Sequence, residues 1–362
     1  MTARIWLALS LTVVLLVPSV LSSPATACCP APPGGKPVVN ADQTVIMIWD
    51  AASQTQHFIR QASFQSEADD FGFLVPTPAE PELAESGNEA FAFLRRLTEP
   101  VTRKVPRPNG GMGCGCSSAS KHAAAPASVK VLSQKLVAGF QAVVLEANSA
   151  DALLGWLKAH DYAFSPEIET WAKPYIEAGW KITALKIAKD RTQDAKSVAT
   201  SALRMTFKTD RPLFPYREPD SRSAAHTLGV HNRLLRIYFL AEARYRGELI
   251  EEHSWTGAVA WANQLKPEDR RQTLALLKLP ETAAPAECWL TEFEDNWRYQ
   301  IAPSDVYFSR DTNQNNVERE AIIQYVTSPW PRDITTYAIL AVLVLAPVRH
   351  RMRRRHLATP RK

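Results

Sequence analysis

The chain has 362 residues, of which 46% are hydrophobic and 22% charged, and its formal net charge is +5. Residues 349–362 hold six arginines, one lysine and no acid, and Arg4 lies near the N-terminus, so removing these eight charges leaves −3 for residues 28–348. A chain of this length fits one large domain or two ordinary ones, and the mildly acidic middle excludes the basic surface of a nucleic-acid-binding protein.

The N-terminus has the pattern of a secretory signal peptide over residues 1–27. Arg4 is followed by the apolar run Ile5–Val17, and Ala25 and Ala27 supply the small residues of a cleavage site. We therefore predict cleavage between Ala27 and Cys28. Lipid attachment to Cys28 is the alternative, but lipoprotein signals usually carry Leu where this chain has Ala25.

Residues 28–98 are predicted to form an N-terminal α+β part. Apolar and alternating runs indicate strands over 43–50, 56–65 and 71–75, the last ending at a series of prolines. The run "GNEAFAFLRRL" indicates a helix over 87–97 because its large apolar residues share one helical face.

Residues 99–130 are rich in Pro, Gly, Ser and Ala and are predicted to be a long loop. They include the stretch "MGCGCSSAS" with Cys114 and Cys116. Loops of this length inside a compact domain are uncommon, so this segment marks the best internal boundary of the chain.

Residues 131–329 are predicted to form the main α+β part, with mainly antiparallel sheet and interspersed helices. The helix predicted over 165–180 should begin at Ser165 and Pro166, with Gly179 at its C-terminal end. We expect strands over 136–147, 180–188, 201–209, 233–245, 287–300 and 304–311, and helices over 149–162, 165–180, 255–265 and 267–279.

The C-terminal region is predicted to be a membrane anchor. Ile334–Val348 is a run of 15 residues without a charge, and with Trp330–Asp333 the segment 330–348 approaches spanning length. The basic tail 349–362 should stay cytoplasmic. This predicts a single-pass protein of the cytoplasmic membrane with its bulk extracytoplasmic; a buried core helix with a basic arm and a processed sorting signal are the alternatives.

Two stretches resemble a known bacterial family. They are the "ACC" start with "DFGFLVPTPAEPEL", and "LEANSADALLGWLKAHDYAFSPEIETWAKPYIEAGWKITALKI" with "LRMTFKTDRPLFPY" behind it. Together they resemble the exported family catalogued as domain of unknown function 2330, over residues 27 to 250 or so. The resemblance implies an exported, often membrane-attached protein and brings no activity, substrate or catalytic residue.

The cysteines are predicted to form structural disulfides in preference to a metal-binding or redox site. Export favours disulfides, and the candidates are Cys28, Cys29, Cys114, Cys116 and Cys288. We expect Cys114 or Cys116 to pair with Cys28 or Cys29, and Cys288 to be a buried free thiol or the fifth partner. A soft-metal site or a redox dithiol at Cys114 and Cys116 is the alternative, although no second ligand pair stands nearby.

No other pattern indicates catalysis. His226 and His231 have metal-like spacing without the Glu of a zinc motif, and His253 follows two acids in what we take to be a solvated loop. The five tryptophans at helical spacing are expected in the core: Trp156, Trp171, Trp180, Trp255 and Trp261.

The sequence thus favours a non-catalytic binding module of the cell envelope, held by its C-terminal helix and binding a protein or envelope component. It predicts no catalytic residue, no cofactor and no nucleic-acid partner. An envelope enzyme or a metal- or thiol-handling protein using Cys114 and Cys116 is the second hypothesis. Substituting serine for both Cys114 and Cys116 would distinguish the two hypotheses, because it should destabilise a fold that is held by disulfides at these positions.

Overall fold

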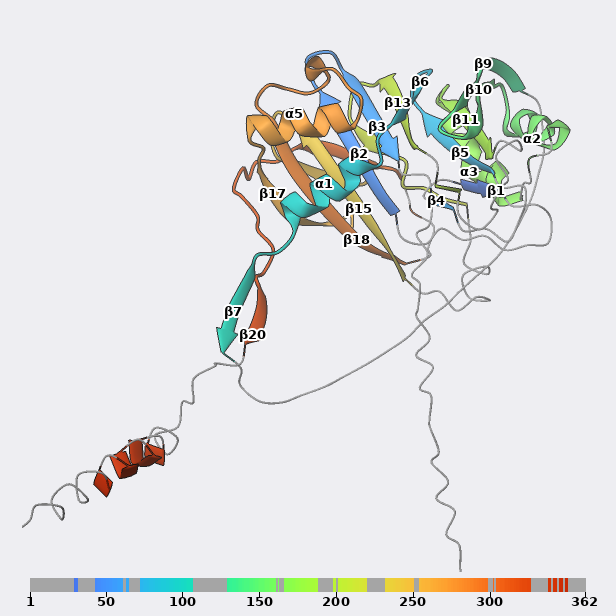
Figure 1. The fold of residues 1–362 in the computed structure, drawn as a ribbon. Coiled ribbons are helices and arrows are strands. Elements are labelled where there is room, and N and C mark those ends of the chain that lie inside the picture. Colours follow the sequence, from blue (N-terminus) through green and yellow to red (C-terminus); the bar gives the residue numbers. More distant parts are fainter. Residues whose placement is uncertain are drawn as a thin grey trace, which may run out of the picture.

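The computed structural model describes most of the two predicted α+β parts, residues 28–98 and 131–329. The described residues are 29–31, 43–60, 63–64, 72–106, 129–160, 162, 166–187, 198–199, 201–219, 232–250, 254–298, 302, 304–326, 338–339, 341–343, 345–347 and 349–350. Figure 1 shows a body of sheets and short helices with a narrow ribbon projecting from it. The body is α+β with mainly antiparallel sheets, as the sequence predicts.

The larger sheet has seven strands in the order β17-β18-β15-β2-β3-β13-β6. Neighbouring strands are antiparallel except β15 and β2, which run parallel at the centre of the sheet. The strands are β2 (Gln43–Asp50), β3 (Thr55–Arg60), β6 (Glu82–Ser86), β13 (Ala202–Lys208), β15 (Asn232–Ala241), β17 (Ala258–Gln264) and β18 (Trp289–Arg298).

The second sheet has five antiparallel strands in the order β1-β5-β11-β10-β9. They are β1 (Cys29–Ala31), β5 (Gly72–Thr77), β9 (Val129–Val137), β10 (Phe140–Ala147) and β11 (Lys181–Ile187). Smaller sheets are formed by β14 (Leu213–Phe214), β16 (Tyr245–Glu248) and β19 (Val306–Arg310), and by β4 (Ser63–Phe64) with β12 (Val198–Ala199). Residues 28–98 and 131–329 thus contribute strands to the same two large sheets.

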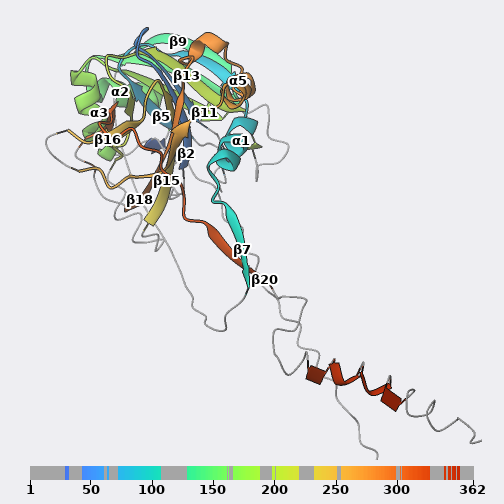
Figure 2. The same ribbon diagram turned by 90° about the vertical axis from the view of Figure 1, so that its left-hand side faces the viewer.

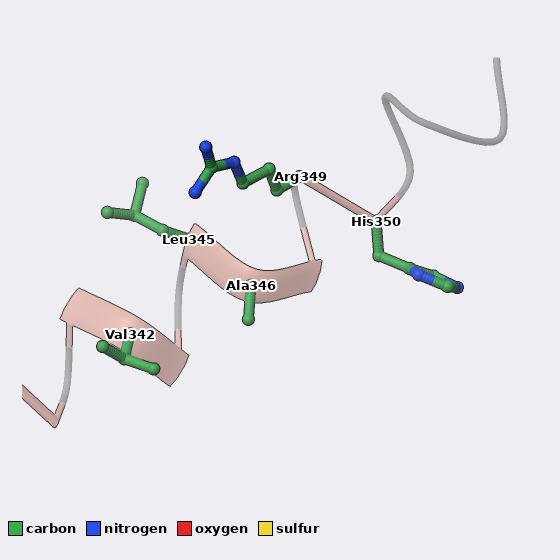
Figure 3. Close-up of a pocket in the computed structure, with 5 residues that line it drawn as sticks. All are labelled: Val342, Leu345, Ala346, Arg349 and His350. Atoms are coloured by element: carbon green, nitrogen blue, oxygen red, sulfur yellow. The ribbon is translucent and has the colours of Figure 1, made fainter. Parts of the chain in front are cut away.

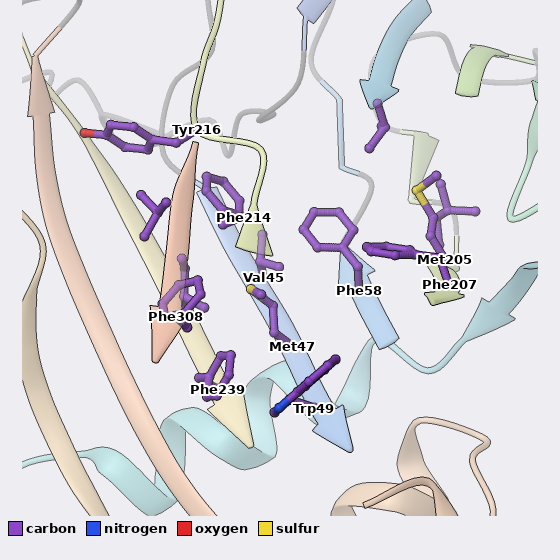
Figure 4. Close-up of a cluster of buried hydrophobic side chains, with 14 of the residues drawn as sticks. Val45, Met47, Trp49, Phe58, Met205, Phe207, Phe214, Tyr216, Phe239 and Phe308 are labelled. Atoms are coloured by element: carbon purple, nitrogen blue, oxygen red, sulfur yellow. The ribbon is translucent and has the colours of Figure 1, made fainter. Parts of the chain in front are cut away.

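The central strand β2 shows why this architecture forms. Its sequence QTVIMIWD places Val45 and Met47 on one face and Ile46 and Ile48 on the other, and all four are fully buried. A strand covered on both faces must be apolar on both. Figure 4 shows Val45, Met47 and Trp49 among the aromatic side chains of the core between the sheets.

Three hydrophobic cores follow from this layering. The largest joins one face of the seven-stranded sheet to the five-stranded sheet and to β14, β16 and β19. A second lies under α2 (Ala150–Ala159) and α3 (Pro166–Glu177), which cover the five-stranded sheet. The third lies under α1 (Glu89–Thr98), α5 (Pro267–Leu276) and the short 3-10 helix η2 (Glu281–Ala283), on the opposite face of the larger sheet.

Residues at the helix ends explain the bounds of α2 and α3: α3 begins at Pro166 as predicted, and Ser165 lies outside the described residues. The Ser149 hydroxyl accepts a hydrogen bond from the Ala152 backbone N–H at 3.0 Å and caps α2. Gly179 follows α3 with a φ of +74°, a left-handed conformation that favours glycine. Of the five tryptophans predicted in the core, Trp156, Trp171 and Trp255 are buried, whereas Trp180 and Trp261 are only partly buried.

Three sequence-based expectations were wrong. The predicted helix over 255–265 is the strand β17, which lies at the edge of the sheet and has a register irregularity between Val259 and Trp261. The predicted single strand over 136–147 lies in a hairpin of β9 and β10 that turns at Ala138 and Gly139. The predicted loop 99–130 contains a strand, β7 (Thr102–Pro106), and the start of β9.

Strand β7 pairs in parallel with β20 (Ile322–Val326) to form a two-stranded ribbon. Figures 1 and 2 both show this ribbon pointing away from the body. Its two strands end side by side, because Pro106 lies opposite Val326.

Much of the predicted anchor 330–348 lies outside the described residues, and what is described there is short helical stretches between 338 and 350. Across the described part of the chain, none of the helices has the length and apolarity needed to cross a bilayer.

Candidate functional site

Most of the sites that the sequence nominates lie outside the described residues. These are Ala27, Cys28, Cys114, Cys116, His226, His231 and His253. Cys29 is the first residue of β1, opposite Leu74 of β5. The pairing of Cys28 or Cys29 with the later cysteines therefore stays a prediction, as do signal cleavage and metal binding.

Cys288 is a free thiol buried just before β18, with 1% of its surface exposed. Its Sγ lies 3.6 Å from the carbonyl oxygen of Trp289, to which the thiol donates. Burial raises the pKa of Cys288 to about 12. The thiol is therefore protonated at neutral pH and lacks the thiolate that reactive cysteines need.

Among the described residues, no three His, Cys, Asp or Glu side chains are grouped as metal ligands. The most concentrated charged group in this part of the chain is instead a network of two arginines and two glutamates on β15, β18 and the segment after β19.

In this network, one Glu292 carboxylate oxygen lies 2.7 Å from Arg236 Nε and 2.9 Å from Arg319 Nη2. One Glu294 oxygen lies 2.5 Å from Arg236 Nη2 and 2.8 Å from Arg319 Nη2. The Glu292 side chain is 1% exposed. Burial opposes ionisation of Glu294, but the hydrogen bonds from Arg319 and Arg236 prevail and lower its pKa. We call these four residues the ionic network.

Strand alternation explains how the ionic network is built. Arg236 and Tyr238 share one face of β15, and Glu292 and Glu294 share the corresponding face of β18. In the antiparallel register Arg236 lies opposite Glu294, and Tyr238 lies opposite Glu292. A backbone bridge between Ala262 and Val317 holds the chain beside the edge strand β17 and thereby positions Arg319.

Next to the ionic network, a cavity of about 180 Å³ lies between α1 and this face of the sheet. Its walls come from β2, the start of α1 and β15, and its lining residues are Thr44, Asn88, Phe91, Ala92, Arg95, Arg236 and Tyr238. We call this cavity the arginine pocket. It has the size of one polar group, below the usual range for a whole small-molecule ligand.

The arginine pocket is rich in hydrogen-bond donors. The Arg95 side chain is 63% exposed, and its contact with Glu99 is 3.9 Å long between two exposed groups, so it is weak and leaves the guanidinium available. Burial raises the pKa of Tyr238 to about 12, so its phenol keeps the proton it can donate. Glu292 Oε2, opposite Tyr238, has no hydrogen-bond partner within the described residues.

A second buried acid, Asp305, joins α3 to the rest of the body. Asp305 Oδ1 accepts hydrogen bonds from the Tyr175 hydroxyl at 2.8 Å and from the Arg217 backbone N–H at 3.0 Å. Burial raises the pKa of Asp305, and these hydrogen bonds lower it. Burial has the larger effect, so the pKa is raised to about 6. The Trp171 indole N–H donates to the Arg217 carbonyl at 2.8 Å. Because these contacts satisfy the carboxylate from within the fold, we assign Asp305 to structure.

A larger concavity of about 570 Å³ is lined by Val342, Leu345, Ala346, Arg349 and His350. Figure 3 shows that all five side chains belong to one helical segment. A hollow with walls from a single segment is not a built site. Its residues instead display the change from apolar to basic that the sequence shows at the end of the predicted anchor.

The sequence alone nominates neither the ionic network nor the arginine pocket. A signal was present, since Arg236 interrupts the apolar strand "LLRIYFLA" and two glutamates alternate with Phe293 in "TEFED". Charges that alternate within a strand predict a polar strip on one sheet face. Which strands bring such strips together depends on pairing between distant segments.

Comparison with known proteins gives a family and no function. A family profile described as "Uncharacterized protein conserved in bacteria (DUF2330)" matches residues 23–309. No curated protein matches the chain. A solved structure of baculovirus P35 aligns with 79% of this chain and 97% of its own, at 9% identity and a TM-score of 0.32. At that TM-score the likeness supports no conclusion.

Proposed function

The chain belongs to the DUF2330 family of uncharacterized bacterial proteins. We propose that it is an exported, membrane-anchored envelope protein that binds an acidic group of a partner. The binding site is the arginine pocket. The proposal concerns recognition and includes no chemical step.

Two features support membrane anchoring. The N-terminus has the three-part pattern of a secretory signal, and Ile334–Val348 is an uncharged apolar run followed by a basic tail. The described helical stretches of this segment carry large side chains that are more than half exposed: Ile339, Val342, Leu343 and Leu345. Such a concentration of exposed apolar side chains is typical of a segment covered by lipid or by a partner.

The observation that carries the binding proposal is the donor set of the arginine pocket. Arg95, Arg236 and Tyr238 line one small cavity, and each carries N–H or O–H groups that can donate hydrogen bonds. Arg236 Nε and Nη2 already bind Glu292 and Glu294. A carboxylate is the natural complement of such donors, because charge-assisted hydrogen bonds from guanidinium groups are strong and directional.

The Glu292 carboxylate narrows the chemical class of ligand that we expect. Its second carboxylate oxygen is buried and without a hydrogen-bond partner in the described part of the chain, beside Tyr238. An unpaired buried acceptor is costly and is satisfied when a ligand donor approaches it. We therefore infer a ligand carboxylate with an amide N–H close by that reaches past Tyr238 toward this oxygen, as in an acidic residue of a peptide; Glu292 itself does not line the cavity.

The test uses N-acetyl-L-glutamate as the probe and isothermal titration calorimetry of the purified full chain in detergent. We expect saturable binding that Arg95→Gln weakens by about tenfold, the loss of one charge-assisted contact. Arg96→Gln is the matched control, because Arg96 is the adjacent exposed arginine of α1 and does not line the pocket.

N-acetyl-L-lysinamide keeps the N-acetyl group and the backbone amide but carries no carboxylate, so it should not bind. Equal binding by the Arg95 and Arg96 variants, or equal binding of the two probes, would show that the pocket does not recognise an acidic group.

A further inference from the structure

The ribbon formed by β7 and β20 exposes more apolar surface than an isolated pair of short strands should. Each strand has five residues, and within the described residues the two pair only with each other. Val101, Ile322, Ile323 and Tyr325 are 66%, 54%, 52% and 48% exposed. A two-stranded ribbon is at best marginally stable in water, so a covering surface would stabilise it.

The two faces of the ribbon differ in chemistry. Strand alternation and the parallel register, in which Ile323 lies opposite Arg103, put Val101, Arg103, Ile323 and Tyr325 on one face. We call it the apolar face. The other face carries Thr102, Lys104, Ile322 and Gln324 and is more polar.

The composition of the apolar face suits the boundary between lipid tails and headgroups. Branched apolar side chains favour the acyl region, and a tyrosine favours the interface because its ring is apolar and its hydroxyl polar. Arg103 can place its stem along apolar surface and its guanidinium among lipid phosphates.

The position of the ribbon in the chain points to the same surface. β20 ends at Val326, and the predicted anchor begins at Trp330. The four steps between these residues span at most about 14 Å. Because β7 and β20 are parallel and end side by side, the tips of both strands lie within this reach of the bilayer.

We propose that the apolar face of the ribbon binds the outer surface of the lipid bilayer, with Ile323 and Tyr325 at the acyl boundary and Arg103 at the phosphates. This inference rests on the membrane anchoring of the proposed function. The ribbon then acts as a second membrane contact that fixes the orientation of the body above the anchor.

The test places the photoreactive residue p-benzoylphenylalanine at position 323 or 325 of the full chain. The protein is held in nanodiscs of phosphatidylethanolamine and phosphatidylglycerol. After irradiation we expect intact masses increased by one phospholipid. Position 324, on the other face of the same ribbon, and position 158, an exposed site on α2 at the far side of the body in Figure 1, are the matched controls. We expect at least fivefold less lipid adduct at both.

Two outcomes would overturn the proposal: a crosslinked dimer in place of the lipid adduct, which identifies a second copy as the occupant, or equal lipid labelling at all four positions. Two positions on the apolar face, 323 and 325, are used because the photoreactive residue at one of them could disturb the ribbon. Carbonate extraction of native membranes separates this inference from its premise. A chain that carbonate releases lacks the anchor, whereas a retained chain without lipid adducts at 323 and 325 has the anchor and lacks the ribbon contact.

Discussion

At the scale of single residues, the ionic network ties three separate segments of the chain together. Glu292 is almost fully buried and contacts Arg236 on the neighbouring strand and Arg319 on the chain that returns beside β17. A buried charge is tolerated only with good partners, and removing one partner costs more than the pair itself contributes. The network therefore specifies how these segments assemble more than it adds to stability.

Arg319→Ala should lower the free energy of unfolding by about 2–4 kcal/mol, because it leaves Glu292 and Glu294 to share Arg236. Urea denaturation followed by tryptophan fluorescence measures the change. Arg246→Ala is the control, since its pair with Glu248 is 3.3 Å long and well exposed, and its cost should stay below about 1 kcal/mol. Equal losses in the two variants would mean that the ionic network has no special role.

The buried carboxyl of Asp305 makes stability depend on pH in an unusual direction. Its pKa is raised from 3.8 to about 6 in the folded state. Between these values the folded chain holds a proton that the unfolded chain releases. The contribution of Asp305 to stability is therefore fully present below pH 3.8 and is lost as the pH rises through 6.

Asp305→Asn removes this titration while keeping an oxygen that accepts hydrogen bonds. We expect the stability of the original chain relative to this variant to fall by up to about 3 kcal/mol as the pH rises from 4 to 7. Urea titrations of both proteins at each pH measure the difference, in which the titration of groups common to both proteins cancels. A difference that does not change with pH, or that grows as the pH rises, would contradict the assignment.

At the scale of elements, α1 is held against α5 at a point that only glycine can occupy. A Cβ on Gly87 would lie 2.0 Å from the Leu276 carbonyl oxygen at the end of α5. Ser86 reinforces the contact, because its hydroxyl donates to the Leu277 carbonyl at 2.7 Å. Since α1 forms one wall of the arginine pocket, this contact also sets the width of that cavity.

Gly87→Ala should therefore destabilise the fold by about 1–3 kcal/mol, the usual cost of overpacking. It should also weaken N-acetyl-L-glutamate binding at temperatures where the chain remains folded, because α1 must shift. Calorimetric melting and the binding titration give the two readouts. Glu89→Ala, two residues away and exposed, should change stability by less than about 1 kcal/mol. An unchanged melting temperature for Gly87→Ala would show that the helices move apart freely.

The sequence predicted those elements whose pattern is complete within one segment. The apolar strand β2 and the Ser149-capped helix α2 are examples, since burial and capping are encoded locally. Strand β17 was mistaken for a helix because its alanines favour a helix and its irregularity between Val259 and Trp261 breaks the alternation of a strand. An edge strand that is only half-buried gives a weak pattern.

The candidate site was beyond sequence reasoning for a different physical reason. Arg95, Arg236 and Glu292 come together through helix packing and strand pairing across nearly 200 residues. Each one alone is an ordinary charge on a helix or strand. Their convergence exists only in the folded chain. The cysteine pairs and the anchor are suggested by composition within one segment, and both stay predictions.

At the scale of the whole molecule, the proposed topology puts the body and the basic tail on opposite sides of one membrane. With an epitope tag after Lys362, protease added to intact spheroplasts should degrade the body and spare the tag. Detergent should then expose the tag as well. Loss of the tag without detergent, or protection of the body, would contradict an anchor that places residues 349–362 in the cytoplasm.

The parallel pairing of β2 with β15 at the centre of the main sheet also constrains how the protein is synthesised and folds. Gln43 lies opposite Leu235, so β2 cannot pair with β15 until about 190 further residues have been synthesised. Closing so long a loop is slow, and the waiting edge of β2 is apolar and prone to aggregation. If the chain is delivered N-terminus first, we therefore expect its yield to rise with the supply of chaperones that hold it unfolded until β15 has emerged.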